Sequence, residues 1–67
     1  MSERTDAWNN TVRKLESMNV NWTRSGDRIY IENISYQDAS KLMDFISKYS
    51  RILKVQYDNF DMTISYH

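Results

Sequence analysis

The sequence contains no cysteine and no proline, and it has one glycine and one histidine. The lack of cysteine excludes disulfides, thiolate metal sites and cysteine nucleophiles, and it is typical of a reducing compartment. The histidine is His67, the last residue, so a histidine-based catalytic or metal site has almost no basis. Gly-rich phosphate loops and nucleophile motifs are also missing from the sequence. We therefore expect no enzyme activity, no metal and no cofactor.

The sequence also has no excess of positive or negative charge, because nine Lys and Arg residues balance nine Asp and Glu residues. A neutral domain lacks the overall field that drives tight binding to nucleic acids or anionic membranes. No apolar run approaches the roughly 18 residues that a membrane span needs. The opening residues, MSERTDAW, lack the apolar core of a signal peptide. These absences predict a cytoplasmic protein without a membrane partner.

The 67 residues predict a single domain over positions 1–67, with residues 1–4 frayed. A chain of this size buries only roughly 60% of the surface that its unfolded form exposes, so its stability margin is thin. Self-association or a permanent partner would relieve that limit.

The segment from Ile34 to Tyr49 carries the strongest helix signal. Ser35 is the predicted N-cap, because its hydroxyl can accept from the unpaired amide three residues on, and Asp38 stands at the matching capping-box position. Apolar residues recur at helical spacing: Ala39, Leu42, Met43, Ile46 and Tyr49. We predict an amphipathic helix here.

An earlier helix is predicted from a cap at Thr5 or Asp6 to Met18. Its apolar side chains are spaced by four, three and three residues, which places them on one face: Trp8, Val12, Leu15 and Met18. Asn19 is the predicted terminator, since asparagine tolerates a left-handed backbone.

The remaining segments alternate between apolar and polar residues, which is typical of strands. One hairpin is predicted from Val20 to Glu32, with its turn at 24–27 around Gly26. A second is predicted from Leu53 to the C-terminus, with its turn at Asp58-Asn59.

The order helix, strand, strand therefore occurs twice, and it predicts an α+β fold of αββαββ type. One apolar face per element implies a four-stranded antiparallel sheet with both helices on one face. The two halves align at offsets of 34 residues in the helices and 35 in the strands, which fits either an internal αββ duplication or convergent patterning. The predicted core is Trp8, Val12, Leu15, Val20, Trp22, Ile29, Ile31, Leu42, Ile46, Tyr49, Val55, Met62 and Ile64.

Nine aromatic residues are more than a core this small needs. Aromatic side chains left near the surface are the usual anchors of protein interfaces. The predicted partner-binding residues are Tyr36, Phe45, Tyr57 and Phe60. The alternative is that singly exposed aromatics have no function.

An alternative site is the polar face of the sheet, where a nucleic acid would contact Arg24, Arg28, Tyr30 and Lys54. Sheets that bind RNA stack bases on two or three aromatics, and this face has one with a firm placement. A solvated sheet face with alternating charges explains the same pattern.

The leading hypothesis is a small intracellular protein-interaction module: an inhibitor, adaptor or modulator of a larger protein, without catalysis. The partner is then another protein. Nucleic-acid binding and homo-oligomerisation, for example as a homodimer, are the alternatives. Such a chain would be typical of a phage or mobile-element accessory protein, although no motif supports that origin.

Overall fold

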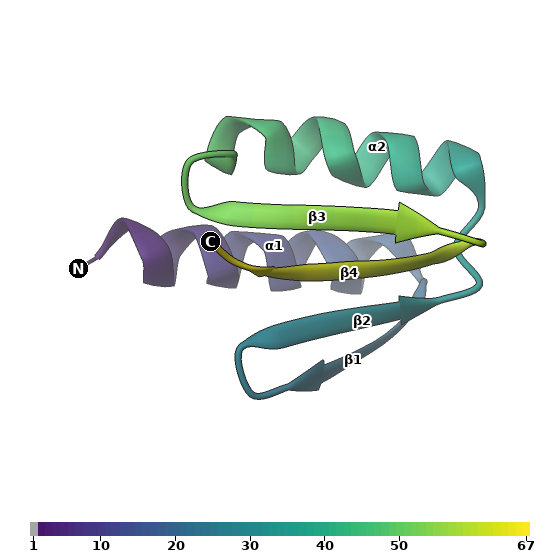
Figure 1. The fold of residues 1–67 in the computed structure, drawn as a ribbon, viewed down its shortest axis with the longest axis horizontal. Coiled ribbons are helices and arrows are strands. Elements are labelled where there is room, and N and C mark those ends of the chain that lie inside the picture. Colours follow the sequence, from purple (N-terminus) through teal and green to yellow (C-terminus); the bar gives the residue numbers. More distant parts are fainter. Residues whose placement is uncertain (1) are drawn as a thin grey trace.

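The protein is described by a computed structural model over residues 2–67. Two α-helices and four strands follow one another in the predicted αββαββ order (Figure 1). Their bounds are α1 Glu3–Met18, β1 Asn21–Ser25, β2 Arg28–Glu32, α2 Tyr36–Ile46, the 3₁₀ turn η1 Ser47–Tyr49, β3 Leu53–Asp58 and β4 Asp61–Tyr66. The predicted α+β class is confirmed.

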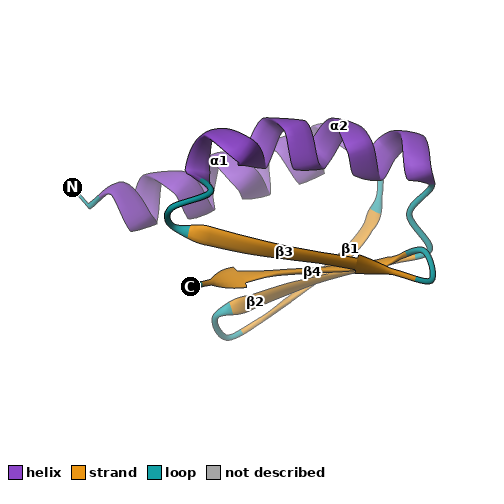
Figure 2. Ribbon diagram, turned by 45° about the horizontal axis from the view of Figure 1, so that its top comes forward, coloured by secondary structure: helices purple, strands orange, loops and turns teal. Residues whose placement is uncertain are grey.

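The strands form one antiparallel sheet in the order β1-β2-β4-β3. The two hairpins are therefore joined through β2 and β4, and β1 and β3 are the edges. Both helices cover the same face of the sheet, and the other face stays open (Figure 2). Neither helix in residues 2–67 is long and apolar enough to cross a membrane.

Helix α1 begins earlier than predicted. The Ser2 hydroxyl accepts a hydrogen bond from the Thr5 amide at 3.2 Å, so Ser2 is the N-cap and the prediction of Thr5 or Asp6 was wrong. Glu3 and Asp6 then lie in the first turn, where carboxylates interact favourably with the helix dipole. The segment predicted as frayed thus includes helical residues, and Met1 lies outside the described residues. Asn19 ends the helix with φ of 57°, as predicted.

Helix α2 begins as predicted but ends sooner. The Ser35 hydroxyl accepts from the Asp38 amide at 3.2 Å. After Ile46 the chain tightens into η1, and the Ser47 hydroxyl donates to the Asp44 carbonyl at 2.6 Å. Serine hydroxyls compete in this way for helix carbonyls, which explains why the regular helix stops three residues before Tyr49.

Both hairpin turns are two residues long. Gly26 and Asp27 connect β1 to β2, and Gly26 supplies a φ of 59°, so Arg24 and Ser25 belong to the strand and not to the turn. The second turn is Asn59-Phe60, one residue later than predicted, because Asp58 pairs with Asp61 at the end of the ladder.

The core lies between the helices and the covered sheet face. Eight predicted core residues are buried: Trp8, Leu15, Ile29, Ile31, Leu42, Ile46, Met62 and Ile64. Five others are half-buried and pack around them: Val12, Val20, Trp22, Tyr49 and Val55. The predicted core missed Ala7, Thr11, Ile34, Ala39 and Leu53. Thr11 can be buried because its hydroxyl donates to the Ala7 carbonyl at 2.8 Å within the helix.

Candidate functional site

The turn between β3 and β4 has an unusual sequence for its backbone. Asn59 and Phe60 both have positive φ, at 51° and 66°, which is the pattern of a hairpin turn that favours Asn followed by Gly. Phenylalanine at the second position places its β-carbon against the following carbonyl, at a cost of roughly 1–2 kcal/mol. The Phe60 side chain is 59% exposed, so little burial offsets that cost.

Two carboxylates flank this strained residue. Asp58 and Asp61 face each other as the last pair of the β3–β4 ladder. Like charges directly opposite each other destabilise a strand pair. The turn therefore combines backbone strain, like-charge repulsion and an exposed ring within four residues.

Three hydrogen bonds fix the turn against the loop that leads into α2. The Ile34 amide donates to the Phe60 carbonyl at 2.7 Å, and the Asn33 amide donates to Asp61 Oδ1 at 3.1 Å. The Tyr57 hydroxyl donates to the Ile34 carbonyl at 2.9 Å. Since Ile34 itself is buried, the loop is anchored in the core and holds the turn in one position.

Tyr36 lies next to this contact, as the first residue of α2 and two residues after Ile34. Its side chain is 69% exposed, the highest value among the large hydrophobic residues described. We call this region, with Tyr36, Phe60 and the residues that fix them, the aromatic end; it lies on the right in Figure 1. Three of the four predicted anchors lie at this end, and the half-buried Tyr57 donates there to the Ile34 carbonyl.

Phe45, the fourth predicted anchor, lies elsewhere. It is half-buried near the end of α2, with the edge of the Tyr49 ring 6.1 Å away between centroids. The ammonium groups of Lys48 and Lys14 lie 4.2 Å and 5.5 Å from its ring centroid. Phe45 is therefore partly covered by charged side chains and is separated from Tyr36 and Phe60 along α2.

The open sheet face carries three of the four residues proposed for nucleic acid. Arg28 and Lys54 flank Ser65 in one row across the sheet, and Tyr30, 40% exposed, lies in the next row opposite Thr63. Arg24 pairs with Ile29 and so points to the other face, where its guanidinium lies 5.4 Å from the Trp8 ring. A turn at 24–27, as predicted, would not have determined the direction of the Arg24 side chain. The turn in the structure covers only residues 26–27, so Arg24 belongs to β1 and the strand sets the face to which it points.

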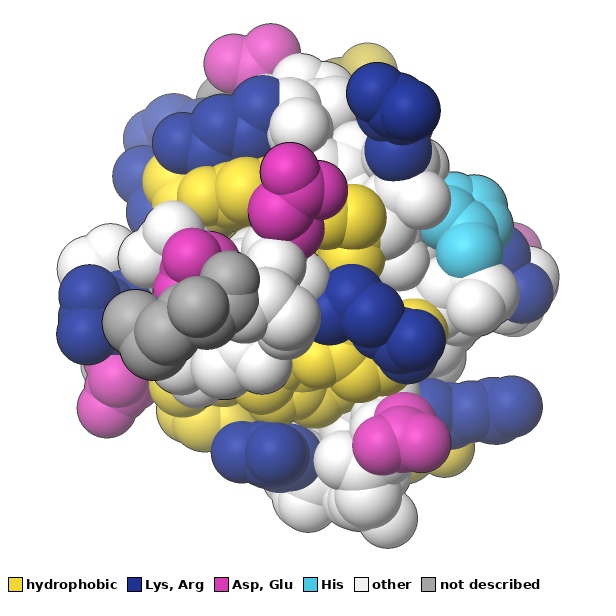
Figure 3. All heavy atoms as spheres, turned by 90° about the vertical axis from the view of Figure 1, so that its left-hand side faces the viewer, with side chains coloured by type: hydrophobic (Ala, Val, Ile, Leu, Met, Phe, Trp, Pro, Cys, Tyr) yellow, Lys and Arg dark blue, Asp and Glu magenta, His cyan; other side chains and the backbone are white. Residues whose placement is uncertain are grey.

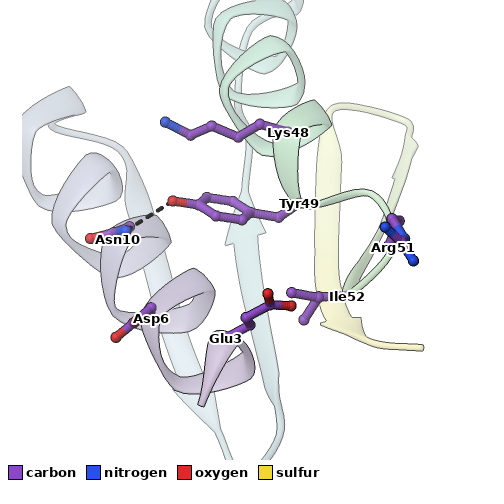
Figure 4. A pocket seen from close by; sticks show the side chains of 7 residues that line it. All are labelled: Glu3, Asp6, Asn10, Lys48, Tyr49, Arg51 and Ile52. Carbon is purple, nitrogen blue, oxygen red and sulfur yellow. Dashed lines mark hydrogen bonds between the residues drawn. The ribbon is translucent and has the colours of Figure 1, made fainter. Parts of the chain in front are cut away.

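A hollow of about 780 Å³ opens at the far end of the molecule from Phe60. It lies between α1 and the chain around η1, and Asn10 donates to the Tyr49 hydroxyl across it at 2.8 Å (Figure 4). Glu3 and Asp6 line one wall, while the other is lined by Lys48, Tyr49, Arg51 and Ile52. No sequence pattern predicts this hollow, because residues of its two walls, such as Asn10 and Tyr49, are 39 positions apart in the chain.

The same end of the molecule carries cations over aromatic rings. Trp8 stacks on Tyr66 at 4.9 Å between centroids, and the Arg4 guanidinium lies 4.2 Å from the Tyr66 ring. Seen from this end, Lys and Arg side chains, with some Asp and Glu among them, lie around patches of hydrophobic surface (Figure 3). Tyr66 is thus covered by Arg4 in the way that Phe45 is covered by lysines.

Within residues 2–67 no group of three His, Cys, Asp or Glu side chains could hold a metal ion. Comparison of the chain with protein-family models, with curated proteins and with solved structures found no match.

Proposed function

We propose that this protein is a non-catalytic protein-interaction module, an adaptor, inhibitor or modulator, that binds its partner through the aromatic end. One observation carries the proposal: an exposed phenylalanine holds a left-handed backbone between two carboxylates. An intracellular location belongs to the same proposal and is supported by the cysteine-free sequence.

The β3–β4 turn has a local energetic cost, from the left-handed backbone of Phe60 and the facing carboxylates of Asp58 and Asp61. Residues with strained backbone or unfavourable charge contacts persist only where the surrounding structure holds them, and such residues cluster at functional sites. Glycine at position 60 would satisfy the turn better, so stability does not explain the phenylalanine. An exposed ring on a fixed backbone loses little entropy on binding, and aromatic side chains are enriched among the residues that dominate binding energy.

The test is the substitution Phe60→Gly, which removes the ring and suits the backbone. Immobilised wild-type protein should retain its partner from a lysate, and the F60G protein should retain at least tenfold less while remaining folded by circular dichroism. Tyr36→Ser should act in the same direction.

Tyr30→Ser is the matched control, because it removes an exposed aromatic from the open sheet face. It should leave capture unchanged, and so should Phe45→Ala if Phe45 is not an anchor. Equal capture by F60G and wild type would refute the aromatic end as the binding site.

A second candidate function, nucleic-acid binding on the open face, is supported by the row in which Arg28 and Lys54 flank Ser65 beside Tyr30. Glu32 lies on the same face beyond Tyr30 and weakens the attraction for phosphates. This function requires that the protein slow the migration of single-stranded DNA or RNA in a gel at low salt, and that it release the nucleic acid as the salt concentration rises. Lys54→Gln should then reduce retardation, and no retardation at low salt would remove the candidate.

A further inference from the structure

Charge is distributed unevenly along the molecule although its net charge is zero. The aromatic end is formed by residues 32–38 and 57–61, which contain no Lys or Arg and carry the carboxylates of Glu32, Asp38, Asp58 and Asp61. The opposite end carries Arg4, Arg24, Arg28, Lys48, Arg51 and Lys54, against Glu3, Asp6 and Asp27. We call this second region the basic end. The longest dimension of the molecule, 33 Å, separates the two ends.

The two ends are also complementary in shape. The aromatic end presents the exposed rings of Tyr36 and Phe60, while the basic end has the hollow beside Tyr49 and Ile52. A volume of about 780 Å³ is within the roughly 300–1,000 Å³ of ligand pockets and accommodates an aromatic side chain. Lys48 and Arg51 line the hollow on one side, where they could pair with carboxylates that accompany the ring.

We propose that the occupant of the aromatic end is a second copy of this chain, bound head to tail. Phe60 enters the hollow beside Tyr49 and Ile52, and Asp58 and Asp61 face Lys48 and Arg51 of the neighbouring copy. The inference rests on the proposed function, since it names the partner of the same site. The contact is heterologous, so a pair of copies keeps one free aromatic end and one free basic end, and assembly continues into a chain.

Chemistry selects this occupant over others. The carboxylates of the aromatic end repel nucleic acids and anionic membranes, and they favour a surface that carries cations beside a hollow with some apolar lining, such as that of Tyr49 and Ile52. The chain itself carries such a surface. Glu3 and Asp6 on the α1 wall oppose the approach of Asp58 and Asp61, which directs these two carboxylates to the Lys48 and Arg51 side.

The interface is small, because the end of the molecule measures about 21 Å by 21 Å. Stable interfaces bury roughly 800 Å² on each partner, so this contact is weak, with an expected dissociation constant on the order of 0.1–1 mM. Its attraction is electrostatic at the rim and falls as salt shortens the screening length from about 30 Å at 10 mM to about 3 Å at 1 M.

Sedimentation equilibrium on the full chain tests the proposal. At about 1 mM protein and about 10 mM salt, the average mass should exceed twice the 8.1 kDa of one chain, and it should fall toward 8.1 kDa at about 1 M salt. A mass of 8.1 kDa at all concentrations in low salt would overturn the proposal.

Paired variants test the head-to-tail geometry. One double variant, Phe60→Gly with Glu32→Lys, disables the aromatic end. The other, Arg51→Glu with Lys54→Glu, disables the basic end. Glu32, Arg51 and Lys54 are exposed, so these changes should not disturb the core, and circular dichroism verifies folding. Each variant alone should be monomeric. Mixed, they should form a 1:1 dimer and nothing larger, because one intact end of each kind remains. If both variants abolish association in the mixture as well, the contact is symmetric and the proposal fails.

Arg13→Glu with Lys41→Glu is the charge-matched control, since both residues are exposed and lie between the two ends. It changes net charge as much as the basic-end variant does but should still assemble into larger species. A monomeric wild type whose lysate capture depends on Phe60 would overturn self-docking and leave the proposed function intact. A monomeric wild type without such capture would overturn both.

Discussion

Left-handed backbone occurs at five of the described residues: Asn19, Gly26, Asn33, Asn59 and Phe60. Glycine has no β-carbon, and asparagine adopts this conformation more readily than other side chains do. Phe60 is the one bulky residue in the set. The cost at position 60 is therefore specific to the side chain and does not follow from the fold.

Phe60→Gly should raise the free energy of unfolding by about 0.5–1 kcal/mol. Relief of left-handed strain, roughly 1–2 kcal/mol, exceeds the entropy that glycine adds to the unfolded chain, roughly 0.4–1 kcal/mol. Urea unfolding measures the difference. Phe60→Ala keeps a β-carbon and should give no such gain; if alanine stabilises as much as glycine, strain is not the reason.

Leu15→Ala and Ile46→Ala should each reduce the free energy of unfolding by about 2–5 kcal/mol. Both side chains are buried, on α1 and α2 respectively, and their loss leaves cavities between helix and sheet. Thermal or urea unfolding measures the change. Val12→Ala, at a half-buried position of α1, should cost less, and equal costs would contradict the core described here.

Hydrogen bonds between elements, not only packing, set the position of the candidate site. The loop before α2 and the β3–β4 turn exchange three bonds, through Asn33, Ile34 and Tyr57. The two αββ units are less alike than their order suggests. Helix caps at Ser2 and Ser35 and turns at 26–27 and 59–60 are 33 residues apart, whereas the buried helix residues Trp8, Thr11 and Leu15 match Ala39, Leu42 and Ile46 at 31. A single offset does not align caps, turns and core.

Tyr57→Phe should cost about 1 kcal/mol, because it removes the hydroxyl that donates to the Ile34 carbonyl. Amide hydrogen exchange at Ile34 should accelerate with it, since that amide belongs to the same contact. Tyr49→Phe is the matched control: it removes a hydroxyl bonded to Asn10 at the other end of the molecule. Faster exchange at Ile34 in both variants would contradict a local role for Tyr57.

At the scale of the whole molecule, the last strand completes the sheet. Strand β4 lies between β2 and β3, so it alone connects the first hairpin to β3 in the sheet. Pairs such as Ile29 with Ile64 join residues far apart in the chain, and such contacts form late and cost loop entropy. The small core gives little stability in reserve.

A chain ending at residue 60 should therefore be unfolded in water. It lacks β4 and with it the buried side chains of Met62 and Ile64. Far-ultraviolet circular dichroism should show loss of both helix and strand signal, since the helices have no complete sheet to cover. A native-like spectrum from residues 1–60 would contradict the role given to β4.

The sequence by itself determined which segments form helices and strands and which face of each is buried. The spacing of Trp8 and Leu15, the cap at Ser35 and the alternation of Ile29 and Ile31 identified helices and strands, because these signals are local and periodic. It also identified Tyr36, Phe45, Tyr57 and Phe60 as aromatics in excess of the core. Two helix boundaries depend on single serine hydroxyls: the start of α1 on the cap at Ser2, and the end of α2 on the bond from Ser47 to the Asp44 carbonyl. Both were missed, because a single hydroxyl leaves no periodic signal in the sequence.

Only the tertiary structure decided where these residues meet. Strand order brought the Phe60 turn to Ile34, and the two-residue turn at Gly26 sent Arg24 to the covered face. The left-handed backbone of Phe60, the hollow beside Tyr49 and the separation of acidic and basic ends have the same origin. Each depends on contacts between residues distant in the chain, and the period of a sequence carries no information about such contacts.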